Sequence, residues 1–352
     1  MSTEIGRLSR LLVAHLGKQS ATNELRWLRQ AAQQLPSSPS SSSSTTTLER
    51  LLERRVSGEP LQYILGTQPF GPLDIRVRPP VLIPRTETEH WTIRLSEILI
   101  QNLPQRPLRI LDLCTGSGCI PLLLLSSLRS ASLSSSNSSP PSPSSSAHPV
   151  HALGVDISDD AIDLAQENAK YACPGISFIP SPLYPGSSSK VPSQSSSSSP
   201  HPAPYTFSTL QTSILSPSFP STLQNLNWGP FDVITSNPPY IPLSEYISLP
   251  ESVKDYEDPR ALLGDPHLLP SISQPDGDIP RTNGNDDPTK IGYTTDTSPP
   301  PAPATTTTIP SDGLTFYRTL AQLVHSPLLR PGGIVALEVG HNQAPRSGIC
   351  FF

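Results

Sequence analysis

The chain has 352 residues and a formal net charge of −5 at pH 7, from 24 lysines and arginines against 29 aspartates and glutamates. It contains 44 prolines, and only 15% of its residues are charged and 6% aromatic, so long stretches cannot bury a core. The acidic balance argues against a stable nucleic-acid partner held by a basic face. No apolar run reaches the length of a membrane span.

The cysteines indicate the redox compartment. They are Cys114, Cys119, Cys173 and Cys350, and no two of them form a Cys-x-x-Cys pair. This pattern is typical of reduced thiols in an intracellular protein and predicts neither a disulfide framework nor a metal site.

Residues 1–58 carry leucines at helical spacing, which predicts a small N-terminal helical domain. A Ser/Pro/Thr-rich stretch at 36–47 predicts a disordered insert within it. The first twenty residues have two interpretations. Their basic residues on an apolar pattern are typical of an organelle-targeting helix, whereas Glu4 favours the first helix of the domain.

Residues 59–90 predict a linker hairpin between this domain and the rest of the chain. Within it, "LQYILG" (61–66) reads as a strand and "FGPLDIRV" (70–77) as part of the hairpin. A helix follows, and the apolar residues expected on one of its faces are Trp91, Leu95, Ile98 and Leu99.

Residues 91–352 predict a doubly wound α/β domain. Buried strands are expected at 108–113, at 150–158, within 231–240 and at 332–340, with helices between them. Ser158 is expected to cap the helix that follows the second strand. The fold class is therefore a Rossmann-like doubly wound sheet with a small N-terminal helical domain.

Further low-complexity stretches at 130–149, 180–205 and 265–311 interrupt this plan between predicted elements. Insertions in surface loops are tolerated because the entropy of loop closure grows only logarithmically with length. We expect neither structure nor chemistry there.

The stretch "LDLCTGSGC" (111–119) joins a buried strand to a helix through two glycines, which let the backbone approach a ligand closely. Asp156 ends the next predicted strand, where a carboxylate can accept two ribose hydroxyls. The pattern lacks the GxGxxG of dinucleotide enzymes and suits a ligand without a pyrophosphate. S-adenosyl-L-methionine fits, although a tight structural turn remains the alternative.

"VITSNPPYIP" places Asn237, Pro238, Pro239 and Tyr240 at the end of an apolar strand. A planar NH2 group can donate one hydrogen to the side-chain oxygen of Asn237 and the other to the carbonyl of Pro238. The prolines stiffen the loop, and Tyr240 can stack on the planar group. This arrangement positions a weakly nucleophilic nitrogen, whereas the alternative is an ordinary proline-rich turn.

These segments resemble class I methyltransferases that use S-adenosyl-L-methionine to modify planar nitrogens. The match rests on "ILDLCTGSGCI", "GVDIS", "FDVITSNPPYIP" and "LEVGHNQ". The stretches "EPLQYILGTQPFGPLDIRVRPPVLIPRTETE", "YEDPRALLGD" and "SDGLTFYR" resemble more specifically the peptide chain release factor N5-glutamine methyltransferases of the HemK/PrmC type, in particular the mitochondrial form. Those enzymes methylate the glutamine of a Gly-Gly-Gln motif.

The resemblance implies site residues. The expected cofactor-binding residues are Asp112, Cys114, Thr115, Gly116, Ser117, Gly118, Asp156, Ser213 and Asn237. The expected catalytic residues are Asn237, Pro238 and Tyr240, with Pro239 completing the glutamine pocket. Arg85, Glu87 and Glu89 would line its mouth, or else be solvated charges at a helix start. No general base is needed, because the amide can lose its proton after the methyl arrives, and His341 is expected to be structural.

The chain departs from the family pattern at several points. Cys114 replaces a glycine, which is tolerable if its φ is negative, and Thr86 replaces a proline. Ser213 stands where an acid is expected to approach the adenine. The family continues past "EVGHNQ" with a helix and two strands, so we expect this chain to lack those strands and to expose a sheet edge.

Two other functions remain open. An adenine-N6 methyltransferase acting on DNA or RNA would use the same Asn-Pro-Pro-Tyr chemistry on a flipped base. A catalytically dead binder of release factors would follow from the short C-terminus. We expect a monomer that acts on a release factor in mitochondria, with the cytoplasm as the alternative.

Overall fold

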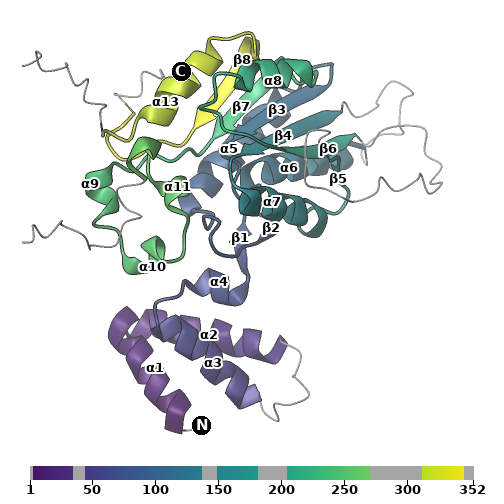
Figure 1. The fold of residues 1–352 in the computed structure, drawn as a ribbon. Coiled ribbons are helices and arrows are strands. Elements are labelled where there is room, and N and C mark those ends of the chain that lie inside the picture. The colour runs from purple at the N-terminus through teal and green to yellow at the C-terminus, as the bar shows by residue number, and fades with distance from the viewer. Residues whose placement is uncertain (1–2, 35–43, 137–148, 181–203, 270–310, 345–352) are drawn as a thin grey trace, which may run out of the picture.

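The computed structural model describes residues 3–34, 44–136, 149–180, 204–269 and 311–344. At the N-terminus, α1 (Thr3–Leu16), α2 (Lys18–Gln34) and α3 (Ser44–Val56) pack on one another around buried leucines (Figure 1). Helix α3 includes 44–47, so the disorder predicted for 36–47 is wrong at these four residues. The rest of that stretch, 36–43, lies outside the described residues.

The segment 61–66, predicted to be a strand, contains instead the short helix α4 (Leu61–Leu65), which ends at Gly66 with a φ of 81°. Leu61 and Ile64 pack on the N-terminal helices, whereas Tyr63 packs with residues that follow the hairpin. Packing on two sides therefore overrides the β propensity of this short apolar run. The hairpin itself is formed by β1 (Thr67–Phe70) and β2 (Leu73–Arg76).

Helix α5 (Thr86–Gln101) begins five residues before Trp91. Leu95 and Leu99 are buried, whereas Ile98 keeps 37% of its surface exposed. Leu95 and Leu99 belong to the same hydrophobic cluster as the leucines of α6 (Cys119–Ser136).

The sheet has the order β5-β6-β4-β3-β7-β8, and all its neighbouring strands pair in parallel. The strands are β3 (Leu108–Leu113), β4 (Val150–Asp156), β5 (Ser177–Phe178), β6 (Tyr205–Gln211), β7 (Phe231–Ser236) and β8 (Leu329–Leu337). Helices cover both faces, so the predicted Rossmann-like doubly wound α/β class is confirmed. The chain crosses over beside β3, where the strand order reverses.

Strands β5 and β6 were not predicted. Strand β6 is buried but carries Thr206, Ser208 and Thr209, so its sequence lacks a continuous apolar run. It begins at Tyr205, inside the stretch 180–205 expected to lack structure, of which 181–203 lies outside the described residues.

The last described strand also differs from the prediction. Strand β8 spans 329–337 rather than 332–340, because its pairing with β7 begins at Leu329 opposite Phe231.

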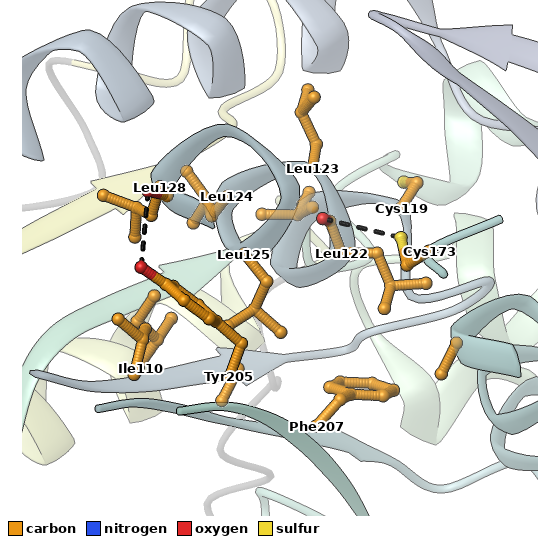
Figure 2. Close-up of a cluster of buried hydrophobic side chains, with 14 of the residues drawn as sticks. Ile110, Cys119, Leu122, Leu123, Leu124, Leu125, Leu128, Cys173, Tyr205 and Phe207 are labelled. Carbon is orange, nitrogen blue, oxygen red and sulfur yellow. Dashed lines mark hydrogen bonds between the residues drawn. The ribbon is translucent and has the colours of Figure 1, made fainter. Parts of the chain in front are cut away.

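One face of the sheet packs against α5, α6 and α7 (Asp159–Tyr171). Figure 2 shows leucines of α6 above Ile110 of β3 and Tyr205 and Phe207 of β6. Helix α6 runs to Ser136, so the insert predicted for 130–149 is wrong at 130–136, and 137–148 lies outside the described residues. The other face packs against α8 (Phe219–Asn225) and α13 (Thr315–Val324).

Cys119 is the first residue of α6 and Cys173 lies beside that helix, and both are buried free thiols. Burial raises the pKa of each thiol to about 12, which keeps them protonated at neutral pH. Cys350 lies outside the described residues. Within the described part of the chain, no cluster of side chains could hold a metal ion, and no helix is long and apolar enough to cross a membrane.

After β7 the chain forms a cap of short helices. These are α9 (Leu243–Tyr246), α10 (Glu251–Lys254), α11 (Pro259–Leu262) and η1 (Pro266–Leu268). Buried Asp265 accepts hydrogen bonds from the Gly313 N–H (2.8 Å) and the Thr315 hydroxyl (2.7 Å). The ends of the stretch 265–311 are therefore structured and held together, contrary to the prediction, while 270–310 lies outside the described residues.

Candidate functional site

A cavity lies at the carboxyl ends of β4 and β7, the edge at which parallel α/β sheets bind ligands. The predicted site residues that line it are Cys114, Gly116, Asp156, Ser213, Asn237 and Pro239. The cap contributes Asp258 and Arg260 to the same cavity, and α13 contributes Phe316. Most of the lining is apolar, so its few polar groups would fix the orientation of a bound ligand.

The turn after β3 presents backbone to this cavity. Cys114, Gly116 and Gly118 have φ angles of 59°, 53° and 77°, so the condition under which a cysteine is easily tolerated at 114, a negative φ, is not met. A Cβ added at Gly118 would lie 3.2 Å from Cβ of Ala165, which explains the glycine where α6 approaches α7. At Gly116 nothing lies within 4 Å of such a Cβ, so its backbone is open toward a ligand.

Asp156 is fixed at the end of β4 by backbone donors. Its Oδ2 accepts a hydrogen bond from the Gly116 N–H (2.9 Å), and its Oδ1 accepts one from the Ser158 N–H (3.0 Å). Burial raises the pKa of this carboxyl above its ordinary value. The side chain of Ser158 makes no capping hydrogen bond, so Ser158 does not cap α7 through its hydroxyl as predicted.

Asp112 and its neighbours lie beneath the turn and do not line the cavity. Oδ1 of fully buried Asp112 accepts a hydrogen bond from the Thr235 hydroxyl (2.6 Å), and Oδ2 has no partner among the described residues. Burial raises the pKa of Asp112 to about 7. Thr115 and Ser117 are also buried, and the Ser117 carbonyl accepts a hydrogen bond from Asn168 (3.0 Å). These residues support the turn from below, as does Gly118.

The turn after β7 presents side chains. Asn237 lines the cavity, and its Nδ2 donates a hydrogen bond to Oγ1 of Thr88 (3.2 Å). The hydroxyl of Tyr240 donates to Oε1 of Glu338 (3.3 Å), and burial raises its pKa to about 12. Pro239 lines the cavity, whereas Pro238 and Tyr240 lie just behind the lining.

Ser213 follows β6 and lines the cavity next to Ile214 and Leu215. Its hydroxyl accepts a hydrogen bond from the Leu215 N–H (3.2 Å), which holds the turn in place. Ile157, which is 51% exposed, lies across from this turn at the edge of the cavity.

The charged residues predicted for the mouth of the site are not part of the cavity lining. Arg85 forms an ion pair with Glu257 (2.6 Å), whose carboxylate is almost fully buried and whose pKa burial raises. Glu87 and Glu89 do not line the cavity, and neither does the exposed His341. Arg85 and Glu87 nevertheless lie near enough to Tyr240 to affect its pKa, so the placement of these residues at the mouth of the site stays a prediction.

Sequence reasoning missed four residues at or behind the site. Thr88 and Glu338 lie behind Asn237 and Tyr240, and Asp258 and Arg260 lie in the lining. These residues lie in "IPRTETE", "LEVG" and "YEDPRALLGD", segments that already showed the resemblance to the family. Only the folded chain shows which residue of each segment meets the cavity.

Comparisons with known proteins give the following matches. A family model described as the PrmC N-terminal domain matches residues 6–66. The chain is 29% identical over 353 residues to a release factor glutamine methyltransferase of Geobacter sulfurreducens, covering 96% of this chain and 86% of that protein. It is 30% identical over 219 residues to the Bacillus anthracis protein of the same name, covering 62% of this chain and 58% of that protein.

A third relative comes from the fission yeast Schizosaccharomyces pombe. It is named probable MRF1 mitochondrial N(5)-glutamine methyltransferase mtq1, and the chain is 36% identical to it over 152 residues. This match covers 43% of each of the two proteins. The chain thus spans most of the length of the Geobacter protein and about half of the other two.

Proposed function

Because the chain belongs to the release factor glutamine methyltransferase family, we propose that it transfers a methyl group from S-adenosyl-L-methionine to a release factor. The acceptor is the side-chain amide nitrogen of the glutamine in the Gly-Gly-Gln motif. The observation that carries this proposal is one cavity lined by both the carboxylate of Asp156 and the side-chain amide of Asn237.

The residues of the cavity fit the cofactor. Asp156 is a half-buried acceptor whose two oxygens are both held by backbone N–H groups, and it suits a ribose with two hydroxyl donors. The open backbone at Gly116 suits the methionine part, and the apolar turn at Ile214 and Leu215 suits a flat adenine. When bound, S-adenosyl-L-methionine supplies an electrophilic methyl group on a sulfonium centre.

The turn after β7 would hold the substrate amide. The Oδ1 of Asn237 and the backbone carbonyl of Pro238 each accept one hydrogen of the amide NH2, and the Tyr240 ring stacks on the amide plane. These contacts fix the nitrogen in one orientation, and such positioning lowers a barrier by several kcal/mol, up to roughly 7–11 kcal/mol in ideal cases.

No residue near Asn237 needs to act as a general base before the transfer. Tyr240 remains protonated at neutral pH because burial raises its pKa to about 12. The amide nitrogen becomes acidic once it carries the methyl group, so the proton can leave to solvent afterwards.

The partner and compartment follow from the same reasoning. The chain acts as a monomer on a release factor, and the N-terminal helices supply the recognition surface. We place it in mitochondria because of the similarity to the fission-yeast protein. A fluorescent fusion found only in the cytoplasm would overturn this location without affecting the reaction.

The reaction is tested by incubating the chain with S-adenosyl-L-methionine and a mitochondrial release factor, followed by mass spectrometry. We expect one added methyl group on the Gly-Gly-Gln glutamine. If no methyl is added although calorimetry detects cofactor binding, the substrate is wrong, and adenine in single-stranded DNA or RNA is the next acceptor to test. If no cofactor binds, the chain is not a methyltransferase but a release-factor binder.

A further inference from the structure

One carboxylate behind the cavity collects three hydrogen-bond donors. Glu338 directly follows β8, and its Oε2 accepts from the Thr88 hydroxyl (2.5 Å) and from Nε1 of Trp91 (3.1 Å). Its Oε1 accepts from the hydroxyl of Tyr240 (3.3 Å). Glu338 thereby links helix α5 to the turn after β7. The function proposed above assigns no role to this network.

The direction of each hydrogen bond in the network follows from the chemistry of its members. An indole N–H can only donate, so Oε2 of Glu338 is an acceptor. The single hydroxyl proton of Thr88 is directed to that same oxygen, and Thr88 is only 2% exposed, which leaves little room for a water. The oxygen of Thr88 can then only accept a hydrogen bond from Asn237.

This order fixes which end of the Asn237 amide faces Thr88. The NH2 group of Asn237 lies 3.2 Å from Oγ1 of Thr88. Its Oδ1 receives no hydrogen bond from any described residue, and Asn237 lines the cavity. The side-chain oxygen of Asn237 is thus the group left for a ligand.

We propose that Thr88 and Glu338 are positioning residues that set the hydrogen-bond polarity of Asn237, so that the site takes an N–H-bearing substrate group and rejects a carboxylate. This inference rests on the proposed function, because it takes Asn237 to face the substrate. If the Asn237 amide turned around, it would offer an NH2 group and favour a glutamate side chain instead.

The test uses two substitutions of Thr88 and a matched control. Thr88→Val keeps the shape of the side chain but removes the hydroxyl, and Thr88→Ser keeps the hydroxyl. Thr92→Val is the control, because Thr92 is a buried threonine one turn later on α5 whose hydroxyl donates to the Thr88 carbonyl (2.6 Å) and does not touch Asn237.

The first measurement does not depend on activity. In the 15N-labelled protein, the side-chain NH2 signals of Asn237 are assigned by their loss in Asn237→Ala, and their exchange with solvent is followed. We expect slow exchange in the wild type, Thr88→Ser and Thr92→Val, and at least about tenfold faster exchange in Thr88→Val, whose Asn237 has lost its acceptor. Equal exchange in Thr88→Val and the wild type would overturn the proposal.

The second measurement compares substrates. We expect Thr88→Val to lower kcat for the release factor about 10- to 100-fold while the Kd for S-adenosyl-L-methionine changes less than about threefold. The wild-type enzyme should bind the release factor more tightly than a release factor whose motif glutamine is replaced by glutamate. In Thr88→Val the ratio of these two Kd values should be about tenfold smaller. Thr88→Ser should restore both values, and an unchanged preference in Thr88→Val would contradict the proposal.

The two proposals fail in different ways. If the wild type methylates no release factor but the exchange pattern is as expected, the proposed function is wrong and the positioning of Asn237 stands. If the wild type is active and Thr88→Val matches it in exchange and in kcat, the positioning is wrong and the function stands.

A substitution of Glu338 provides an independent check. A glutamine at this position can keep an oxygen toward Thr88 and Trp91 while its NH2 donates to Tyr240. In Glu338→Gln the rate at which the Asn237 NH2 exchanges with solvent should therefore stay within about threefold of the wild-type rate. In Thr88→Val this rate should rise by more than that. Faster exchange in Glu338→Gln than in Thr88→Val would show that the charge, rather than the hydroxyl, holds Asn237 and would overturn the assignment to Thr88.

Discussion

The turns after β3 and β7 end neighbouring parallel strands but reach the cavity by different means. The first turn uses backbone, with positive φ at Cys114, Gly116 and Gly118 and an N–H that binds Asp156. The second uses the side chain of Asn237, held from behind by Thr88.

This difference determines what each turn can tolerate. A backbone turn depends on conformation, so substitutions there should change stability and cofactor affinity. A side-chain turn depends on chemical identity, so substitutions there should change the reaction while the fold persists. The following changes test this contrast, beginning with the largest expected effect.

Asn237→Ala should lower kcat about 1,000-fold, because it removes the acceptor that orients the substrate nitrogen. The Kd for S-adenosyl-L-methionine should change less than about fivefold, and this pair of values is measured by methylation kinetics and calorimetry. Asn102→Ala, at the exposed end of α5, is the matched control and should behave as the wild type. An Asn237→Ala protein that loses cofactor binding as completely as activity would remove the contrast between the turns.

Asp112→Asn should stabilise the protein at pH 8, because Asp112 is buried with one oxygen unpaired. Its pKa is raised from an ordinary value of 3.8 to about 7, so the folded chain keeps a proton that the unfolded chain releases. The wild type therefore loses free energy of unfolding as the pH rises from about 4 to about 7, and the loss is complete above that range.

The gain of Asp112→Asn should thus grow across the same pH window, to about 2–4 kcal/mol at pH 8. Urea unfolding without cofactor at pH 4 and at pH 8 measures it. Asparagine can still accept the hydrogen bond from Thr235, so little change is expected at pH 4. A gain that is equal at both pH values would mean that packing, not charge, sets the effect.

Asp156→Asn should weaken the binding of S-adenosyl-L-methionine about 10- to 100-fold, because hydrogen bonds to a charged acceptor contribute about 1.5–3 kcal/mol. Calorimetry measures this change directly. Asp163→Asn changes an exposed carboxylate on α7 and should leave the affinity unaltered. Unchanged affinity in Asp156→Asn would place the cofactor elsewhere.

Cys114→Gly should stabilise the protein by about 0.5–1 kcal/mol, because a positive φ costs a residue with a Cβ about 1–2 kcal/mol and glycine recovers most of that. Asn227→Gly is the matched comparison at a φ of 57°, and asparagine tolerates this region, so its gain should be near zero. Thermal unfolding of both variants measures the difference. A larger gain at Asn227 would refute the idea that the turn after β3 stores strain.

The sheet illustrates how much of the fold the residue pattern reveals. Strand β3 is mostly aliphatic and its position was predicted, whereas β6 carries buried threonine and serine residues and was missed. The helix α4 was read as a strand because a five-residue apolar segment has no clear period. Short or polar elements take their form from what packs against them.

The candidate site shows the same division. Asp156 and Asn237 were predicted because each polar residue ends a buried strand, and parallel strands end at one edge of a sheet. Asp112 and Ser117 belong to the segment that was predicted to bind the cofactor, but both are buried and neither lines the cavity. Arg85 forms an ion pair with Glu257 of the cap, a partner 172 residues away that the sequence pattern does not reveal.

The local pattern of residues thus specifies the α/β class, the two turns and the residues at the strand ends, since periodicity and turn chemistry act between near neighbours. The polarity of Asn237 does not follow from that pattern. It depends on Thr88, 149 residues earlier, and Glu338, 101 residues later, which meet only when the sheet and α5 have packed. Hydrogen bonds between residues so distant in the chain exist only in the folded protein.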